Sequence, residues 1–354
     1  MKLSAKALKR GLLISVLSGA VSVLLVLALT RHELDWEGLK LIRPSYFTLA
    51  ALLVVGAWFA RVVRLKILLA ALGERVPFKR LVNIFLSSCF ISQVTPTTGG
   101  GLPLQIYMIY RQGVNFGNTV AASVVDSFLT ILFYIIVAPL LLIIWRSRLK
   151  IQPLTLGILG FAILAVCTFL LYLILKPEFV GKWLINLGKT RILRFLDRRR
   201  RLDRWAKRVT EEVQRYREAM VLLAKKQRSA LWWSFFFTFA YWGLYLAIAP
   251  VLLVGLNVKF DLVQTMVAQL ILNFIQPFFP TPGASGGAEL SFAYFFRGVV
   301  PGGILGIYVM SWRLITYYLS LISGAISLVY ALKNGWLERH KLEGDWDVKG
   351  DSGS

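Results

Sequence analysis

The chain has 354 residues, of which 57% are hydrophobic, and 41 Lys and Arg against 18 Asp and Glu give a net charge of +23. Such an apolar share excludes an ordinary soluble domain and predicts an integral membrane protein. A charge of this size would indicate nucleic acid binding in a soluble protein. Here the basic residues lie mainly in loops beside apolar segments, as the positive-inside rule expects, so we predict no nucleic-acid partner.

Six apolar segments are long enough to cross a bilayer as helices. They are residues 11–30, 46–72, 118–145, 153–175, 229–253 and 302–332. The first follows a basic start, as a signal peptide does, but it lacks a clean cleavage site and we expect it to be retained. We therefore predict an all-α integral membrane protein, a single polytopic domain over residues 1–354 with about six full transmembrane helices.

Two further apolar segments, 78–94 and 262–279, lead directly into motifs rich in Pro and Gly. The motifs are Thr95-Pro96-Thr97-Thr98-Gly99-Gly100-Gly101 and Pro280-Thr281-Pro282-Gly283-Ala284-Ser285-Gly286-Gly287. Such sequences break a helix and free backbone groups that lipid cannot satisfy. The segments that follow, 102–110 and 288–296, are too short to cross. We predict two re-entrant helical hairpins, each broken at its motif.

The two motifs lie at a constant offset of 186 residues, which places Gly100 over Gly286 and Arg111 over Arg297. With a cytoplasmic N-terminus, the first hairpin enters from the cytoplasm and the second from the outside, and the C-terminus is also cytoplasmic. The pseudo-repeats 46–145 and 229–332 are therefore predicted to form an inverted repeat. This is a common plan of alternating-access transporters, whose binding sites lie at broken helices.

The segment between the repeats, residues 176–228, holds 17 Lys and Arg against 6 Asp and Glu, a net charge of +11. This charge predicts a cytoplasmic position. Apolar residues are spaced among the arginines as in an amphipathic helix that lies on a membrane surface and attracts anionic lipid headgroups. The alternative is a solvated loop that only fixes the topology.

Two ionisable residues lie deep in predicted spans. Asp126 is roughly 13 Å and Arg313 roughly 16 Å along its helix, near the middle of the bilayer core. They follow Gly101 and Gly287 by 25 and 26 residues, which places both close to the pseudo-two-fold axis. One interpretation is that they pair with each other, and a purely structural ion pair is an open alternative. A lone charge facing lipid is too costly.

Three basic residues, Arg61, Arg64 and Lys66, lie toward the cytoplasmic end of their span. Snorkelling to the headgroups explains them, and a role in substrate binding is the alternative. Glu289 follows the second glycine pair, where an acidic residue caps a helix N-terminus or faces a cavity. Its counterpart in the first hairpin is Pro103.

Neutral polar groups are expected to complete the site. In the first hairpin, Gln105 and Tyr107 take the place of an acidic residue. Thr97, Thr98 and Ser285, together with free amides around the glycines, are suited to bind a phosphate oxygen. The cysteines and histidines have no metal-ligand spacing and the sequence lacks a nucleotide-binding glycine motif, so we expect no metal, cofactor or catalytic residue.

The two motifs, with Gln105-Ile106-Tyr107, the region from Ser123 to Asp126, Gly286-Gly287-Ala288-Glu289, and Arg313 with Tyr317, resemble the lysylphosphatidylglycerol synthase transmembrane-region family. This is the membrane module of multiple peptide resistance factor proteins and of free-standing prokaryotic homologues. The resemblance implies a lipid flippase in the cell membrane of a prokaryote, and an aminoacylated phosphatidylglycerol-like cargo. The chain ends 22 residues after its last span, so we expect the family's soluble synthase domain to be absent and the chain not to be an enzyme.

The predicted substrate-binding residues are Glu289, Arg313, Asp126, Gly286, Gly287, Pro280, Pro282, Gly283, Pro96, Thr97, Thr98, Gly99, Gly100, Gln105, Tyr107 and Tyr317. Two alternative functions are a carrier of polyprenyl-phosphate or lipid-linked sugar, and a membrane enzyme or accessory subunit for lipid headgroup modification. Besides membrane phospholipids, the partners considered are a second copy of the chain in a homodimer and a separate lipid-modifying enzyme.

Overall fold

The computed structural model describes residues 43–145, 165, 168–169 and 199–336. Within these residues every regular element is a helix. The predicted span 11–30 lies outside the described residues, and so does almost all of 153–175 and the first part of the basic segment 176–228.

The first half contains two long helices with a broken hairpin between them. Its elements are α3 (Pro44–Ala71), α4 (Phe78–Val94), the short η2 (Pro96–Thr98), α5 (Gly101–Tyr110) and α6 (Phe116–Trp145). Helix α10 (Arg199–Lys225) follows. The break between α4 and α5 falls at the Pro and Gly residues of the first motif, as the sequence predicts.

The second half repeats this order. Its elements are α11 (Arg228–Leu246), α12 (Ile248–Gly255), α13 (Leu262–Ile275), η3 (Gln276–Phe278), η4 (Pro282–Ala284), α14 (Gly287–Phe296), α15 (Gly302–Arg313), η5 (Leu314–Tyr318) and α16 (Leu319–Lys333). Adding 186 to the bounds of η2 and α5 gives the bounds of η4 and α14, and adding 186 to the first residue of α6 gives that of α15. The offset read from the motifs thus holds for whole elements.

Four helical segments within the described residues are long and apolar enough to cross a membrane. They are Pro44–Ala71, Phe116–Val137, Arg228–Gly255 and Gly302–Lys333. They coincide with four of the six predicted spans. Large apolar side chains such as Leu52, Phe59 and Trp232 are more than half exposed on them, as expected for surfaces that face lipid. The protein is embedded in a membrane.

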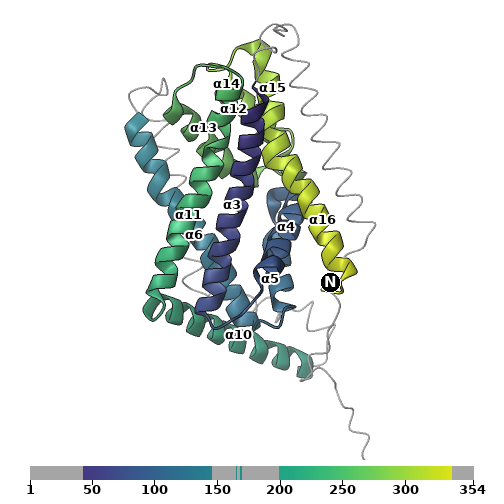
Figure 1. The fold of residues 1–354 in the computed structure, drawn as a ribbon. Coiled ribbons are helices and arrows are strands. Elements are labelled where there is room, and N and C mark those ends of the chain that lie inside the picture. The colour runs from purple at the N-terminus through teal and green to yellow at the C-terminus, as the bar shows by residue number, and fades with distance from the viewer. Residues whose placement is uncertain (1–42, 146–164, 166–167, 170–198, 337–354) are drawn as a thin grey trace, which may run out of the picture.

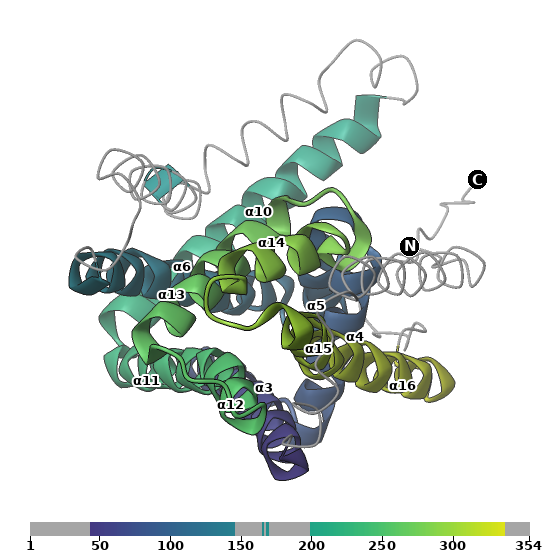
Figure 2. The same ribbon diagram turned by 90° about the horizontal axis from the view of Figure 1, so that it is seen from above.

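The hairpins lie toward opposite ends of the molecule. In Figure 1, α4 and α5 occupy the lower half, α13 and α14 occupy the upper half, and α10 runs across the lower end. Figure 2 shows α14 and α15 near the middle of the bundle, with α3, α6, α11 and α16 around them. The two turns approach each other inside the bundle, where η2 contacts η4 and α4 also contacts η4.

The last span of each half packs against the hairpin of the other half, since α6 contacts α13 and α16 contacts α4. The α16–α4 contact is close: a Cβ added at Gly324 would lie 2.5 Å from the Leu86 carbonyl oxygen. No larger residue fits at this position without moving a helix. The halves are therefore interlocked, and each hairpin is held by spans from both.

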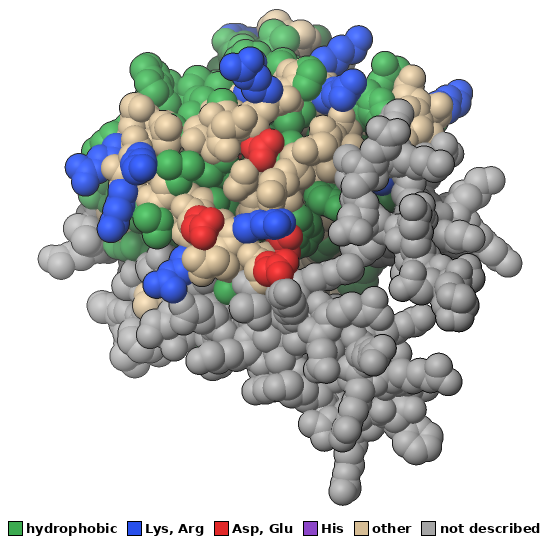
Figure 3. Space-filling view, turned by 90° about the horizontal axis from the view of Figure 1, so that it is seen from below, with side chains coloured by type: hydrophobic (Ala, Val, Ile, Leu, Met, Phe, Trp, Pro, Cys, Tyr) green, Lys and Arg blue, Asp and Glu red, His purple; other side chains and the backbone are tan. Residues whose placement is uncertain are grey.

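Helix α10 is docked on the lower end by an apolar face. Tyr216, Ala219 and Leu223 are buried in the core that α3, α4 and α6 share. A Cβ at Gly117, near the start of α6, would lie 2.6 Å from the Cβ of Arg215. Burial raises the pKa of Tyr216 to about 12, so its phenol stays neutral at physiological pH. Figure 3 shows basic side chains around the described part of this end, with acidic ones nearer its centre.

Candidate functional site

A buried ion pair closes the turn of the second hairpin. The Nε atom of Arg313 donates to Oε1 of Glu289 at 2.7 Å, and the two side chains are 3% and 1% exposed. Nη2 of Arg313 donates to the Gly283 carbonyl at 3.2 Å, and Oε2 of Glu289 accepts from the Gly286 amide at 2.8 Å. Both partners thus bind backbone groups that the helix break leaves free, which removes much of the cost of breaking a helix inside a membrane.

Positive φ angles and close packing both favour glycine in this turn. Gly283 and Gly286 have φ values of +59° and +89°, a region that disfavours residues with a Cβ. A Cβ at Gly283 would also lie 2.3 Å from the Tyr317 ring, and one at Gly287 would lie 2.3 Å from the Phe279 ring. The glycines therefore allow aromatic rings to pack directly against the turn.

Arg313 is the last residue of α15, and a π-helical stretch, η5, follows it directly. Single π-helical turns inside longer helices occur frequently at functional sites. The guanidinium carbon of Arg313 lies 4.7 Å from the ring centroid of Tyr317, which belongs to this stretch, and 5.5 Å from the ring centroid of Trp312. The guanidinium group is thus held by a carboxylate, a carbonyl and two rings.

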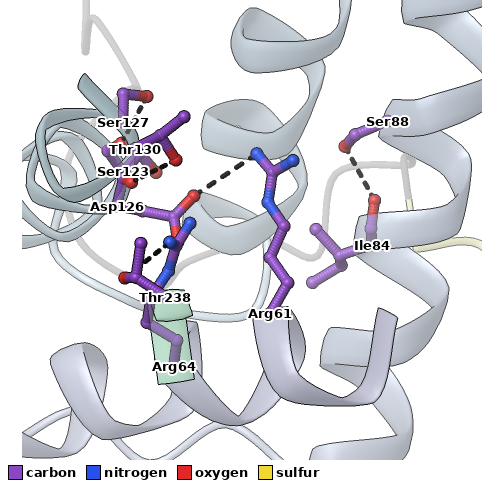
Figure 4. Close-up of polar contacts among 9 residues, drawn as sticks. All are labelled: Arg61, Arg64, Ile84, Ser88, Ser123, Asp126, Ser127, Thr130 and Thr238. Carbon is purple, nitrogen blue, oxygen red and sulfur yellow. Dashed lines mark hydrogen bonds and ion pairs between the residues drawn. The ribbon is translucent and has the colours of Figure 1, made fainter. Parts of the chain in front are cut away.

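The first half contains a separate cluster of charges between helices. Nε of Arg64 on α3 donates to Oδ1 of Asp126 on α6 at 2.6 Å, and Nη1 donates to the Thr238 hydroxyl of α11 at 2.9 Å. Arg61, one turn earlier on α3, reaches Oδ2 of Asp126 at 3.4 Å. Figure 4 shows both guanidinium groups directed at the same carboxylate. This cluster joins three spans, whereas the Glu289–Arg313 pair joins a hairpin to a span.

The interpretation that Asp126 and Arg313 pair with each other is wrong. Asp126 is paired with Arg64 and Arg61, and Arg313 is paired with Glu289. The reason is packing: α6 lies against α3, and α15 lies against α14. Equal spacing from the glycines placed the two charges at similar depth, but each finds a partner in its own half.

Snorkelling does not explain Arg64, whose side chain is fully buried and ion-paired. Arg61 is also paired, although its side chain remains 32% exposed. Lys66 lies over the Phe78 ring, 5.8 Å from the centroid. The approximate 3.6-residue period of a helix places Arg61 and Arg64 on one face, and this spacing in an apolar segment was the available signal for a common partner. Thr238 carries no comparable signal in the sequence.

The interpretation of Glu289 as a helix cap is confirmed, and the interpretation that it faces a cavity stays a prediction. Its carboxylate caps α14 through the Gly286 amide, and it also lies at depth against Arg313. The turn of the first hairpin has no charge in this role. There the Thr95 hydroxyl accepts from the Gly100 amide at 3.1 Å and donates to the Ile91 carbonyl at 2.7 Å.

The remaining predicted residues are spread around the two turns. Pro96, Thr97 and Thr98 form η2, Gly99 and Gly100 lead into α5, Pro280 precedes η4 and Pro282 begins it. The Thr97 side chain is exposed and its hydroxyl donates to the Pro96 carbonyl. Gln105 and Ser285 are both buried. The Nε2 atom of Gln105 and the hydroxyl of Ser285 have no hydrogen-bond partner. Tyr107 points to a more exposed position.

No group of three or more His, Cys, Asp or Glu side chains that could hold a metal ion occurs in the part of the chain that the structure describes. The charged side chains buried within the described residues are two arginines, Arg64 and Arg313, and two carboxylates, Asp126 and Glu289. Such a site is suited to bind charged or polar groups through hydrogen bonds and ion pairs.

Comparison with known proteins identifies the family of the chain. The model of the family described as "Lysylphosphatidylglycerol synthase TM region" matches residues 12–324. The chain belongs to this family. A "UPF0104 membrane protein" of Archaeoglobus fulgidus is 28% identical over 332 residues, which cover 94% of this chain and 99% of the relative. Membership in the lysylphosphatidylglycerol synthase TM region family is consistent with a membrane role related to lipids, and the match is to the membrane region of that family.

Proposed function

We propose that the protein moves a phospholipid with a polar headgroup between the two leaflets of a membrane. The headgroup passes through the polar region between the two hairpin turns, while the acyl chains remain in lipid. The observation that carries this proposal is the meeting of two broken-helix turns, η2 and η4, inside the bundle. Broken helices near the midplane form the binding sites of many secondary transporters.

The proposed path has opposite entrances. The first hairpin lies toward the end that carries α10, and the second lies toward the other end. The positive charge of the segment that contains α10 favours a cytoplasmic position for the end of the molecule that carries this helix. On this orientation the halves 46–145 and 229–332 form an inverted repeat of re-entrant hairpins in a prokaryotic cell membrane. Alternating access would then need one hairpin and its supporting spans to move against the other.

The Glu289–Arg313 pair is suited to act as a latch in such a movement. Each partner binds both the other side chain and the turn backbone, so opening the second hairpin would release several contacts together. A passing headgroup carries its own phosphate and polar groups, which can replace these contacts. In this proposal, the predicted residues of the turns contact the headgroup in the opened state.

The basic segment 176–228 is proposed to gather anionic phospholipids at the cytoplasmic entrance. Each basic residue near an anionic surface contributes about 1 kcal/mol to this attraction. Arg215 has a half-exposed side chain on α10, and its backbone lies close to α6. Lipid collected here would therefore lie next to the start of a spanning helix.

The direct test is leaflet exchange in liposomes that contain the purified protein. A membrane-impermeant reagent would report how much of a phospholipid reaches the outer leaflet, with aminoacylated phosphatidylglycerol, plain phosphatidylglycerol and a polyprenyl phosphate as separate cargoes. Exchange faster than in protein-free liposomes supports the proposal. Exchange of only the polyprenyl phosphate would favour the alternative carrier function. A chemically altered headgroup without exchange would favour a modifying enzyme.

A further inference from the structure

The two charge clusters do not balance. Together they hold three arginines, Arg61, Arg64 and Arg313, and two carboxylates, Asp126 and Glu289. Arg61 lies ten residues before the end of α3, roughly 15 Å along the helix. Asp126 lies ten residues after the start of α6, also roughly 15 Å along its helix. One positive charge is therefore in excess at a depth where an uncompensated charge is costly.

Arg61 is the cation in excess. Arg64 is fully buried and makes the shorter contact to Asp126, at 2.6 Å. Glu289 and Arg313 are 2.7 Å apart and almost inaccessible. Arg61 makes a long contact of 3.4 Å to a carboxylate that already has a partner, and 32% of its side chain is exposed. Its other side-chain hydrogen bond is to the neutral Tyr241.

The exposed part of Arg61 faces into the protein. The outer face of α3 carries Leu52 and Phe59, which are 62% and 55% exposed. Two residues along a helix turn by about 200°, so Arg61 lies opposite Phe59. Its own face is that of Ala50, Val54, Ala57 and Arg64, all of them buried. Lipid tails therefore do not surround the guanidinium group.

Aromatic rings from two other helices flank this group. The Arg61 guanidinium carbon lies 5.3 Å from the Phe85 centroid on α4 and 5.9 Å from the Tyr241 centroid on α11. Tyr241 stacks on Tyr245 at 5.9 Å, and Tyr245 interacts electrostatically with Arg313. The two rings and a side-chain hydrogen bond to Tyr241 orient the guanidinium group, and its remaining N–H groups are suited to donate to a phosphate.

We propose that Arg61 binds the phosphate of an anionic lipid headgroup, and that the cargo carries a net negative charge. This inference rests on the proposed lipid translocation and narrows its cargo. A phosphatidylglycerol-like headgroup, with one negative charge, neutralises the excess. A headgroup bearing a lysyl group carries a net positive charge and is repelled. The expected order of affinity is therefore anionic, then zwitterionic, then cationic.

Binding is tested with the full chain in detergent, by following its thermal unfolding as lipid is added. The probes are short-chain phosphatidylglycerol, phosphatidylcholine, lysyl-phosphatidylglycerol and the water-soluble glycerol phosphate. We expect phosphatidylglycerol to raise the unfolding temperature saturably, with an apparent affinity that Arg61→Gln lowers about tenfold or more. Arg61→Lys keeps the charge but loses the fork of donors, so its affinity should fall between the two.

The matched control is Arg297→Gln, which also removes one positive charge. Arg297 is exposed and lies over the Tyr294 ring at 4.4 Å, away from both clusters. The affinity of the Arg297→Gln variant for phosphatidylglycerol should equal that of the wild type. Equal binding of phosphatidylglycerol by Arg61→Gln and the wild type, or equal binding of the three lipids by the wild type, would overturn the site. Glycerol phosphate binding as well as the lipid would overturn the lipid as its occupant.

A transport measurement on the same proteins separates this inference from the proposed function. If phosphatidylglycerol binds through Arg61 but the wild type moves no lipid, the site stands and translocation fails. If the wild type and Arg61→Gln move phosphatidylglycerol at the same rate, translocation stands and the Arg61 site fails. Both proposals are supported when the wild type prefers the anionic lipid and Arg61→Gln loses that preference.

Discussion

The two hairpin turns share a backbone plan but are closed by different chemistry. Thr97 in the first turn and Gly283 in the second, related by the 186-residue offset, have nearly the same backbone angles, with φ of 55° and 59°. The Gly100 amide is bound by a threonine hydroxyl, whereas its counterpart, Gly286, is bound by a carboxylate that is itself paired with Arg313. Equivalent turns are thus closed differently. We call the Thr95–Gly100 hydrogen bond the neutral clasp and the Glu289–Arg313 pair, with its bond to Gly286, the ionic clasp.

This difference indicates that the two turns have different roles. A neutral hydrogen bond contributes about 1 kcal/mol, which is enough to hold a turn that keeps its shape. A buried ion pair is costly to desolvate and strongly destabilising when broken from one side. It is a poor way to gain stability but a suitable way to make a turn respond to a charged ligand. We therefore expect the second turn to move during transport and the first to remain closer to rigid.

The largest effect is expected from Arg313→Met. This change removes the ion pair, the bond to the Gly283 carbonyl and the contacts with two rings, and it leaves Glu289 charged and buried. The loss of stability should be about 3–5 kcal/mol. Thermal or denaturant unfolding in detergent measures it. A loss below about 1 kcal/mol would mean that the ionic clasp does not hold the turn.

Added methyl groups at the start of the return helices should have an intermediate effect. In Gly101→Ala the Cβ would lie 2.8 Å from the Ser88 carbonyl oxygen, and in Gly287→Ala it would lie 2.3 Å from the Phe279 ring. Overpacking of this kind costs about 1–3 kcal/mol. Gly243→Ala is the control, because nothing lies within 4 Å of its added Cβ. If all three variants unfold alike, the turns are looser than the structure shows.

A smaller effect is expected when the neutral clasp is removed. Thr95→Val keeps the shape of the side chain and leaves the Gly100 amide without its acceptor, at a cost of about 1–2 kcal/mol. Thr265→Val serves as the control, since its hydroxyl only donates to the Asp261 carbonyl within a helix. The comparison of turns predicts that lipid transport by Thr95→Val persists. Its complete loss in well-folded protein would show that the two turns are functionally equal.

The smallest effect concerns α10, the helix that runs across the lower end of the bundle. Replacing Arg199, Arg200 and Arg201 of α10 by Gln should leave stability unchanged, because apolar residues farther along dock this helix. It should reduce the anionic phospholipid that copurifies with the protein, and the reduction should be largest at low salt. Mass spectrometry of bound lipid measures this ratio. An unchanged ratio at low salt would leave the positioning of the chain as the only role of these charges.

The sequence predicted all four spans found within the described residues and both helix breaks, because long apolar segments and Pro/Gly motifs are local signals. The first segment of the second hairpin, predicted as 262–279, was resolved further into α13 and η3. The pairing of Asp126 could not be predicted, because it depends on which spans pack together. Equal spacing suggested Arg313 as its partner, and only the contact of α6 with α3 shows that Arg64 takes this place. The π-helical turn after Arg313 also has no marker in its apolar sequence.

The role of the ionic clasp can be separated from its contribution to folding with the double variant Glu289→Gln and Arg313→Met. It removes both charges, while the Gln side-chain oxygen can still accept from the Gly286 amide. Replacing both members of a buried pair is much less destabilising than removing one. We therefore expect the double variant to recover most of the stability that Arg313→Met loses and to reach the membrane folded.

The most direct test of the central claim is the rate of phospholipid exchange between leaflets of liposomes that contain this double variant or the wild type in equal amounts. We expect rapid exchange by the wild type and exchange no faster than in protein-free liposomes by the folded double variant. Equal exchange by the two proteins would show that the charges serve only the fold. No exchange by the wild type with any phospholipid would contradict the proposed function itself.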